Sequence, residues 1–324
     1  MSVHPSSFSS YSSWPEGLAP HVAALLEGIR QAAYPPIYQL PVEQARKVYE
    51  TSIGVMSLPA VEMARVENLT LSDAAAQPMR ARLWAPTTAS GLPVLLYLHG
   101  GGFVVGGIAT CENMCRRIAA LSGAAVLAVE YRLAPEHRFP AAVEDSFAAL
   151  RWLHERGADL GLDPRHLAVG GDSAGGTLTA TTALMARDAG IALAAQLMFY
   201  PSVQISQSTE SFKRYADRLL LSKELMAWFE QNYRDANGTT DWRREPLKAD
   251  LRGVAPAWIG LAQCDALADD GRLYAEALRQ AGVPVQLQEW PGMIHDFINM
   301  ERMVPEAGDA HVAFARALKA AFER

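Results

Sequence analysis

Cysteine is scarce in this chain of 324 residues, which contains only Cys111, Cys115 and Cys264. Three cysteines cannot build the disulfide framework that stabilises small secreted domains. Cys111 and Cys115 are spaced to share one face of a helix, but no histidine or further cysteine is spaced to complete a metal site with them. We therefore expect all three to be packing residues, and we predict no metal site.

Basic charge and long apolar runs are also lacking. The formal net charge is -6 with an isoelectric point of about 5.8, and no run of basic residues is available to neutralise phosphates. This composition argues against a nucleic-acid partner. No apolar run is long enough to cross a membrane, and the first ten residues lack the basic and apolar regions of a secretory signal. We expect a cytoplasmic protein without stable membrane insertion.

Half of the residues are hydrophobic, which at this length is enough for one large core. Strand patterns occur near residues 61–71, 78–85, 93–98, 124–131, 166–170, 193–199, 256–262 and 284–290. Helical patterns occur near residues 110–121, 140–156, 174–189, 270–281 and 305–323. Because helices alternate with strands after the first two strands, the sequence predicts an α/β fold with a mostly parallel, eight-stranded sheet and helices on both faces.

A serine between glycines is the most informative motif. Residues 170–176 read Gly-Gly-Asp-Ser-Ala-Gly-Gly, between a buried strand pattern and a helical pattern. A strand-to-helix turn of this kind is strained, and a side chain at Gly171 or Gly175 would collide with the neighbouring strand or helix. We expect the turn to expose the hydroxyl of Ser173, with the amide of Ala174 pointing the same way. The motif alone is moderately specific, since glycine-rich packing turns also produce it.

A second glycine-rich segment, His-Gly-Gly-Gly-Phe at residues 99–103, follows the apolar run at 93–98. Consecutive glycines leave backbone N–H groups uncovered, which suits the binding of an anion. In a surface linker the same glycines would indicate only a flexible loop. Here they follow a strand that is apolar on both faces, so the amides should face the carboxyl edge of the sheet. We expect the amides of Gly101, Gly102 and Ala174 to form an oxyanion hole.

A serine hydroxyl needs a general base to accept its proton as it attacks. Of the eight histidines, His295 is the one that follows a strand pattern and a Pro-Gly turn at the predicted carboxyl edge of the sheet. His99 begins the glycine-rich segment and fits a structural role, in which it would brace the glycines by hydrogen bonds. The other six lie in the N-terminal segment, on loops or helix surfaces before the serine, or in the C-terminal helical pattern.

An acid that orients the histidine should come from the loop after the preceding strand, which reads Gln-Cys-Asp-Ala-Leu-Ala-Asp-Asp at residues 263–270. Asp265 is closest to the strand end, and we predict that it is this acid. Asp269 and Asp270 fit the cap and first turn of the following helix. Asp296 is adjacent to the histidine in the chain and is therefore badly placed to reach its Nδ1.

Together these motifs resemble the hormone-sensitive lipase family of the α/β-hydrolase superfamily. Residues 99–102 are similar to its oxyanion motif and residues 171–175 to its nucleophile turn, while Asp265 and His295 match its acid and base in the expected chain order. Residues 131–142, which read Tyr-Arg-Leu-Ala-Pro-Glu-His-Arg-Phe-Pro-Ala-Ala, also match a segment typical of the family. Several motifs in the right order are far more specific than any one of them.

The resemblance spans about residues 61–324. It implies an α/β-hydrolase fold with a helical cap, and hydrolysis of carboxylic esters with short to medium acyl chains through an acyl-serine intermediate. No metal or organic cofactor is implied. Two segments interrupt the strand–helix alternation and lie where the family places a cap. They are residues 1–55, with helical patterns at 18–32 and 41–52, and residues 202–248, with a helical pattern near 222–234. Residues 56–201 and 249–324 would then form the two parts of the hydrolase core.

Apolar side chains in and near this cap should decide which ester is bound. We expect such pocket surface from Tyr34, Phe103, Tyr200, Leu219 and Met293. The alternative for each of these residues is a place in the hydrophobic core. The resemblance also suggests a homodimer.

Two other functions fit part of the pattern. An amidase, or an esterase for a specialised ester such as a lactone, would use the same residues because the triad does not distinguish leaving groups. A non-catalytic ligand receptor on this fold would retain the serine and lack the histidine. His295 is present, which disfavours the receptor.

Overall fold

The structure is a computed structural model that describes residues 14–73, 76–235 and 241–324. The first thirteen residues of the predicted cap segment therefore lie outside the described part. The strands are β1 (Arg65–Asp73), β2 (Ala76–Ala85), β3 (Leu92–Leu98), β4 (Ala125–Val129), β5 (Leu162–Asp172), β6 (Gln196–Phe199), β7 (Ala257–Cys264) and β8 (Val285–Ile294). The α-helices are α1 (Pro20–Ala32), α2 (Val42–Met56), α3 (Ile108–Ser122), α4 (Ala141–Arg156), α5 (Ala174–Asp188), α6 (Glu210–Tyr215), α7 (Lys223–Tyr233), α8 (Ala268–Gln280) and α9 (Glu306–Phe322).

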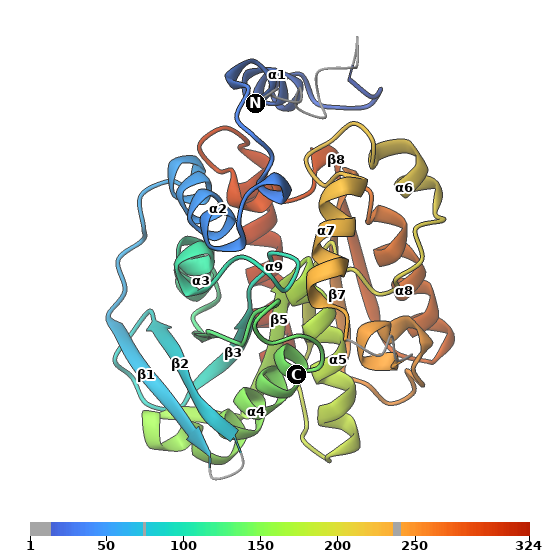
Figure 1. Cartoon of the computed structure of the whole chain (residues 1–324). Coiled ribbons are helices and arrows are strands. Elements are labelled where there is room, and N and C mark those ends of the chain that lie inside the picture. Colours follow the sequence, from blue (N-terminus) through green and yellow to red (C-terminus); the bar gives the residue numbers. More distant parts are fainter. Residues whose placement is uncertain (1–13, 74–75, 236–240) are drawn as a thin grey trace.

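Within the described residues, the strands form one eight-stranded sheet in the order β1-β2-β4-β3-β5-β6-β7-β8 (Figure 1). β2 runs antiparallel to both β1 and β4, and every later pairing, from β4 and β3 across to β7 and β8, is parallel. The predicted fold class is confirmed. Parallel strands need helical crossovers, which explains why the sequence alternates strand and helix after β2.

Each face of the sheet is covered by its own hydrophobic core, and β3 shows how one strand supplies both. Val94, Leu96 and Leu98 pack into the core that contains side chains of α4, α5 and α8. Leu95 and Tyr97 pack into the core that contains side chains of α3 and α9. Successive strand residues point to opposite faces. A strand that is apolar at every position is therefore buried on both sides, as the run at residues 93–98 predicts.

The two segments predicted to form the cap contain α1 and α2, and α6 and α7. In the view of Figure 1, α7 lies between α2 and α6. α7 begins with Ser222 as its N-cap, whose hydroxyl accepts a hydrogen bond from the backbone N–H of Leu225. The short helix α6 is an element that the sequence patterns did not indicate.

One sequence expectation was wrong near the end of the sheet. Pro291 and Gly292 are not a turn after the last strand, because β8 continues through them to Ile294. The register between β7 and β8 shifts between Ala262 and Cys264, which accommodates the extra residues as an irregularity in the pairing. His295 therefore follows the strand directly.

The three cysteines are buried and form no disulfide with one another. All three belong to the hydrophobic core that contains side chains of α3 and α9, as expected of packing residues. Across the described ranges, no group of three or more His, Cys, Asp or Glu side chains is arranged to hold a metal ion. No helix within those ranges is long and apolar enough to span a membrane.

Candidate active site

Ser173 occupies the sharp turn between β5, which ends at Asp172, and α5, which begins at Ala174. Its φ of 54° and ψ of -120° lie outside the regions that L-residues ordinarily adopt. The backbone N–H of Ser173 donates to the carbonyl oxygen of Phe199 at the end of β6, at 2.9 Å. Strain of this kind persists only where the surroundings determine it, and it is often found at functional sites.

Two glycines make this turn possible by allowing the backbone to approach its neighbours closely. A Cβ atom built on Gly175 would overlap the carbonyl oxygen of Leu98, and one on Gly171 would overlap the same oxygen. The start of α5 therefore packs directly against the end of β3, as expected from the glycine positions. This contact places the turn beside the glycine-rich segment that follows β3.

The structure brings Ser173, His295 and Asp265 together from three distant parts of the chain. Oγ of Ser173 lies 2.9 Å from Nε2 of His295, and Nδ1 of His295 lies 2.6 Å from Oδ2 of Asp265. The other oxygen of Asp265, Oδ1, accepts the backbone N–H of Leu267 at 2.9 Å. A carboxylate on Nδ1 selects the tautomer in which Nε2 can accept a proton. The arrangement can therefore transfer the serine proton to the imidazole.

The imidazole of His295 is held close to a charged partner inside the protein. Burial by itself would lower the pKa of His295. The charge and hydrogen bond of Asp265 and the charges of Asp296 and Asp172 have the opposite effect. Together they outweigh burial and raise the pKa above its ordinary value of 6.5. A raised pKa strengthens the imidazole as a base. It also means that protonation disables the base at a higher pH than for a free histidine.

Asp172, inside the serine turn, hydrogen-bonds locally. Its Oδ1 accepts the hydroxyl of Tyr97 at 2.6 Å and the backbone N–H of Gly100 at 3.1 Å. Burial, with the charge of Asp296, raises the pKa of Asp172 to about 7, although both hydrogen bonds oppose the rise. Asp172 thus connects the turn to the first glycine of the segment after β3.

His99 has the structural position that was expected of it. Its Nδ1 lies 2.7 Å from the carbonyl oxygen of Gly100, to which it can donate. The ring of Tyr131 stacks on the imidazole, with centroids 4.2 Å apart, and the Tyr131 hydroxyl donates to the carbonyl oxygen of His99. Burial lowers the pKa of His99, which favours the neutral ring. These contacts hold the backbone of the glycine-rich segment in place.

Two of the three candidate oxyanion donors, Gly102 and Ala174, border one cavity. Gly102, Ser173 and Ala174 all line it. The amides of Gly101 and Gly102 donate to no acceptor in the described part of the chain, and the N–H of Ala174, at the first position of α5, has no partner within the helix. Gly102 has a φ of 59°, and a Cβ at this position would overlap the ring of Phe229 on α7. α7 therefore lies directly over the glycine-rich segment.

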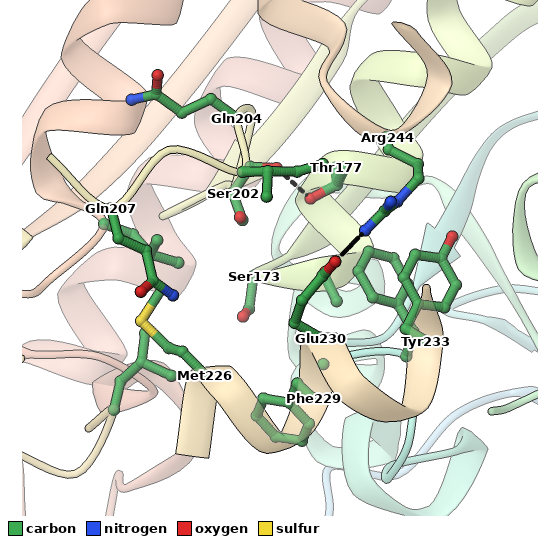
Figure 2. Close-up of a pocket in the computed structure, with 16 residues that line it drawn as sticks. Ser173, Thr177, Ser202, Gln204, Gln207, Met226, Phe229, Glu230, Tyr233 and Arg244 are labelled. Carbon is green, nitrogen blue, oxygen red and sulfur yellow. Dashed lines mark hydrogen bonds and ion pairs between the residues drawn. The ribbon is translucent and has the colours of Figure 1, made fainter. Parts of the chain in front are cut away.

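The cavity beside Ser173 has a volume of about 110 Å³. Figure 2 shows Met226, Phe229 and Glu230 on α7 around Ser173, with Tyr233 of the same helix farther off, near Arg244. Apolar surface comes from Phe103, Ile205, Leu221, Met226, Phe229 and Leu267. Polar groups come from Thr177, Ser202, Gln204, Gln207, Glu230, Tyr233 and Arg244.

A single ion pair forms the charged part of the cavity wall within the described residues. Both carboxylate oxygens of Glu230 accept Nη2 of Arg244, at 2.6 and 2.7 Å, as Figure 2 shows. Arg244 belongs to the short 3-10 helix η4 (Trp242–Arg244) and its side chain is only 7% exposed. Its guanidinium also lies over the ring of Phe139, 5.7 Å from the centroid.

Of the five side chains expected to line the pocket, only Phe103 does so. Leu219 and Met293 are buried in the hydrophobic core that contains side chains of α3 and α9. Tyr34, in the connection between α1 and α2, is 80% exposed. Tyr200 is fully buried behind His295, with ring centroids 4.5 Å apart. The expectation was wrong for these four because apolar type does not reveal which side of a segment faces the cavity.

The lining residues that sequence reasoning missed lie mainly on α7, on η4 and on the loop after β6, which supplies Ser202, Gln204, Ile205 and Gln207. The helical pattern near residues 222–234 did indicate a helix outside the sheet alternation. Reading its apolar positions as pocket surface would have selected Met226 and Phe229. Nothing in the sequence indicated Glu230 or Arg244, because they belong to separate elements that meet only in the folded chain.

The remaining acidic candidates have other partners. Asp269 accepts the backbone N–H of Ser211, and Asp270 accepts that of Val203. Asp296 accepts the hydroxyl of Tyr49 at 3.0 Å and the side-chain amide of Asn299 at 2.9 Å. Among the acids considered, Asp265 is thus the one in hydrogen-bond contact with the imidazole.

Comparison with known proteins places this site in a family. A family described as the alpha/beta hydrolase fold matches residues 95–299. The chain is 43% identical over 244 residues to the carboxylesterase NlhH of Mycobacterium tuberculosis, covering 74% of this chain and 76% of that protein. It is 37% identical over 313 residues to the ethyl acetate hydrolase of Pseudomonas putida, covering 93% of this chain and 98% of that protein.

Solved structures agree with the sequence matches. A thermostable esterase from Pseudomonas putida superimposes with a TM-score of 0.91 at 34% identity, covering 96% of this chain and 99% of that one. An ester hydrolase from the metagenome of Lake Arreo, in complex with a derivative of bipyridine phosphonate, superimposes with a TM-score of 0.89 at 35% identity, covering 95% and 100%. The chain therefore belongs to the α/β-hydrolase family, in its hormone-sensitive-lipase-like branch, and is an ester hydrolase.

Proposed function

We propose that this enzyme hydrolyses carboxylic esters of short to medium acyl chain through a triad of Ser173, His295 and Asp265. The observation that carries the proposal is the continuous hydrogen-bonded line from Ser173 Oγ through the imidazole to Asp265, with distances of 2.9 and 2.6 Å. A serine is a sufficient nucleophile only with such a base in contact. The residues that supply it are also the ones that the sequence motifs indicated.

In the first half of the reaction, Oγ of Ser173 attacks the ester carbonyl carbon while Nε2 of His295 accepts the hydroxyl proton. The alcohol then leaves with that proton, and the acyl group remains bonded to Oγ. Water repeats the sequence in the second half: His295 accepts a proton from water, the hydroxide oxygen bonds to the acyl carbon, and the acid leaves as Oγ regains its proton. Asp265 keeps the imidazole oriented and stabilises its positive charge.

The tetrahedral intermediate places a negative charge on the former carbonyl oxygen. We assign its stabilisation to the backbone amides of Gly101, Gly102 and Ala174. Uncovered amides at a helix start and a glycine turn are suitable donors because they need no reorganisation during the reaction. Gly102 and Ala174 border the same cavity as Ser173, which supports this assignment.

The size and lining of the cavity support a small acyl group. A volume of about 110 Å³ beside the serine, bordered by Phe103, Phe229 and Met226, suits a short apolar chain. Another part of the cavity wall contains the charged side chains of Glu230 and Arg244, to which an alkyl chain can form no hydrogen bond. Covering these charges with apolar carbon would be unfavourable.

Rates with p-nitrophenyl esters from acetate to dodecanoate test this proposal. We expect the highest kcat/KM between acetate and hexanoate, and we expect Ser173→Ala to lower kcat by at least about 10⁴-fold. Lys47→Ala, an exposed change on α2, is the matched control. Full activity of Ser173→Ala would refute the triad, while a maximum at dodecanoate would refute only the chain-length assignment.

A phosphonate probe separates the ester hydrolase from a ligand receptor on the same fold. An activated Ser173 should form a covalent adduct that mass spectrometry detects on the peptide containing residues 170–176. The same experiment with His295→Ala should show much slower labelling, since the base is gone. Parallel assays with anilides and lactones measure how far the same residues act on other leaving groups.

We also propose that the enzyme forms a homodimer through the edge of the sheet and the last helix. β8 is the outermost strand on its side of the sheet, and α9 exposes Val312 at 41%. An unpaired strand edge can pair with the same edge of a second copy. Sedimentation velocity measures the mass, and a monomer at micromolar concentration would exclude the dimer.

A further inference from the structure

Two side chains of α2, one helical turn apart, bond to two different loops of the active site. Nε of Arg46 donates to the carbonyl oxygen of Val104 at 2.8 Å, directly after the glycine-rich segment at residues 99–103. The hydroxyl of Tyr49 donates to Oδ2 of Asp296 at 3.0 Å, in the residue that follows His295. Residues three apart on a helix project from the same side.

Arg46 holds the glycine-rich segment through more than one bond. Its Nη2 also donates to the carbonyl oxygen of Ala134, at 2.9 Å, and the backbone N–H of Ala134 donates in turn to the carbonyl oxygen of Phe103, at 2.9 Å. Glu136 accepts both terminal nitrogens of Arg46, which fixes the guanidinium plane. The backbone N–H of Val104 donates to the carbonyl oxygen of Gly101. A displacement of Val104 would therefore move the glycines.

Tyr49 holds the other loop at a conformationally demanding position. Asp296 has a φ of 68°, in the left-handed region that only a few side chains tolerate. Its carboxylate is held from two sides, by the Tyr49 hydroxyl on Oδ2 and by Nδ2 of Asn299 on Oδ1, at 2.9 Å. The backbone that carries His295 is thus fixed one residue away from the imidazole.

We propose that α2 is a positioning element, in which Arg46 and Tyr49 set the spacing between the oxyanion donors and the general base. This inference rests on the proposed function of Ser173, His295 and the glycine amides. Both groups act on the same tetrahedral centre, so an error of about 1 Å in their spacing can cost about a hundredfold in rate. One rigid helix bonded to both loops makes their movements dependent on each other.

The lining of the cavity predicts which kinetic constant responds. The residues that border it come from residues 102–103, 173–177 and 202–267, and none belongs to α2. Loss of the α2 bonds should therefore leave substrate contacts in place and misplace the reacting groups. We expect kcat to fall while KM changes little.

The test compares Tyr49→Phe, Arg46→Met and the double variant with two controls on the full-length chain. Arg302→Met removes a hydrogen bond from Nη2 to the carbonyl oxygen of Ser57, just beyond the end of α2. It weakens helix docking and leaves the bonds from α2 to Val104 and Asp296 in place. Lys47→Met removes an exposed ion pair with Glu43. Each protein is assayed with p-nitrophenyl butyrate, and its melting temperature is measured.

We expect about a tenfold loss of kcat for Tyr49→Phe and for Arg46→Met, with KM within about twofold of wild type. Arg46→Lys should recover part of the loss because its ammonium can still donate to Val104. Arg302→Met should lower the melting temperature and keep kcat. The inference is overturned if Tyr49→Phe and Arg46→Met retain wild-type kcat, or if Arg302→Met loses as much kcat as they do. A Ser173→Ala variant assayed in parallel tests the proposed function separately.

Discussion

The ring of Tyr200 packs against the imidazole of His295, with ring centroids 4.5 Å apart and planes inclined at 51°. Tyr200 is fully buried, and its hydroxyl has no hydrogen-bond partner in the described part of the chain. The ring therefore supports the imidazole of His295, the proposed general base, by packing against it, and the hydroxyl forms no hydrogen bond in this part of the chain. The two parts of this side chain can be separated by mutation.

Tyr200→Phe should retain wild-type kcat and lose no stability, because an unpaired buried hydroxyl costs free energy. Tyr200→Ala should lower the free energy of unfolding by about 3–5 kcal/mol, since it leaves a cavity. It should also lower kcat because the imidazole loses its packing. Urea denaturation and ester assays measure both effects. A large loss of activity in the phenylalanine variant would contradict this assignment.

The pH dependence of kcat/KM should report the raised pKa of His295. The base works only when neutral, so the rate should rise with pH through an acid limb centred above 6.5, the ordinary value of the pKa. Assays between pH 5 and 9 locate this limb. A rate that stays constant down to pH 4 would exclude a histidine base.

Asp265→Asn should move the acid limb toward lower pH, because the charge that raises the pKa of His295 is removed. It should also lower kcat by about 10⁴-fold, since the amide no longer selects the productive tautomer. Asp296→Asn is the matched comparison. It removes a charge that also raises the pKa of His295 but has no hydrogen bond to the ring, so we expect a smaller shift and a small loss of kcat.

Two glycine substitutions should have opposite effects on stability. Gly175→Ala would place Cβ onto the carbonyl oxygen of Leu98, and we expect a loss of about 1–3 kcal/mol together with loss of activity. Gly54→Ala lies on the exposed side of α2 with nothing within 4 Å of the new Cβ, and we expect a gain of about 0.5–1 kcal/mol. Thermal unfolding of both variants checks the pair. Equal effects would show that close packing at the serine turn is not limiting.

The ion pair of Glu230 and Arg244 should restrict the length of the acyl chain. The double variant Glu230→Leu/Arg244→Met removes both charges, so no unpaired charge is left buried. We expect the ratio of kcat/KM for octanoate to that for butyrate to rise about tenfold, because each added methylene can then be buried favourably.

Asp250→Asn/Arg252→Met removes an exposed ion pair away from the cavity and serves as its control. The ratio for this control should equal that of wild type. An unchanged ratio in the Glu230→Leu/Arg244→Met variant would mean that another part of the wall limits the chain.

Much of the fold followed from local patterns. The all-apolar run in β3 predicted a strand buried on both faces, and its alternate side chains do enter two separate cores. The positions of Gly171 and Gly175 predicted the turn at Ser173, whose φ is 54°. Both features are marked by residue types at short spacing, an unbroken apolar run or glycines on each side of a serine, which is why sequence patterns reveal them. The contact that requires glycine at Gly175 is nevertheless with Leu98 on a distant strand.

Other features could not be predicted in this way. Tyr200 lies behind His295 and not in the pocket, although its apolar character fitted either place equally well. The apparent turn at Pro291-Gly292 is absorbed into β8 because its neighbour β7 accommodates the irregular register. Each outcome depends on what a distant segment places beside the residue.

The sequence by itself determined the order of strands and helices along the chain, the place of the serine turn and the family to which its motifs belong, because apolar periodicity and glycine spacing show over a few neighbouring residues. Only the tertiary structure decided that α7 and η4 form part of the pocket wall, that Arg244 pairs with Glu230, and that α2 bonds to two active-site loops. These contacts join residues that are far apart in the chain, and the direction of each side chain is set by the packing of whole elements.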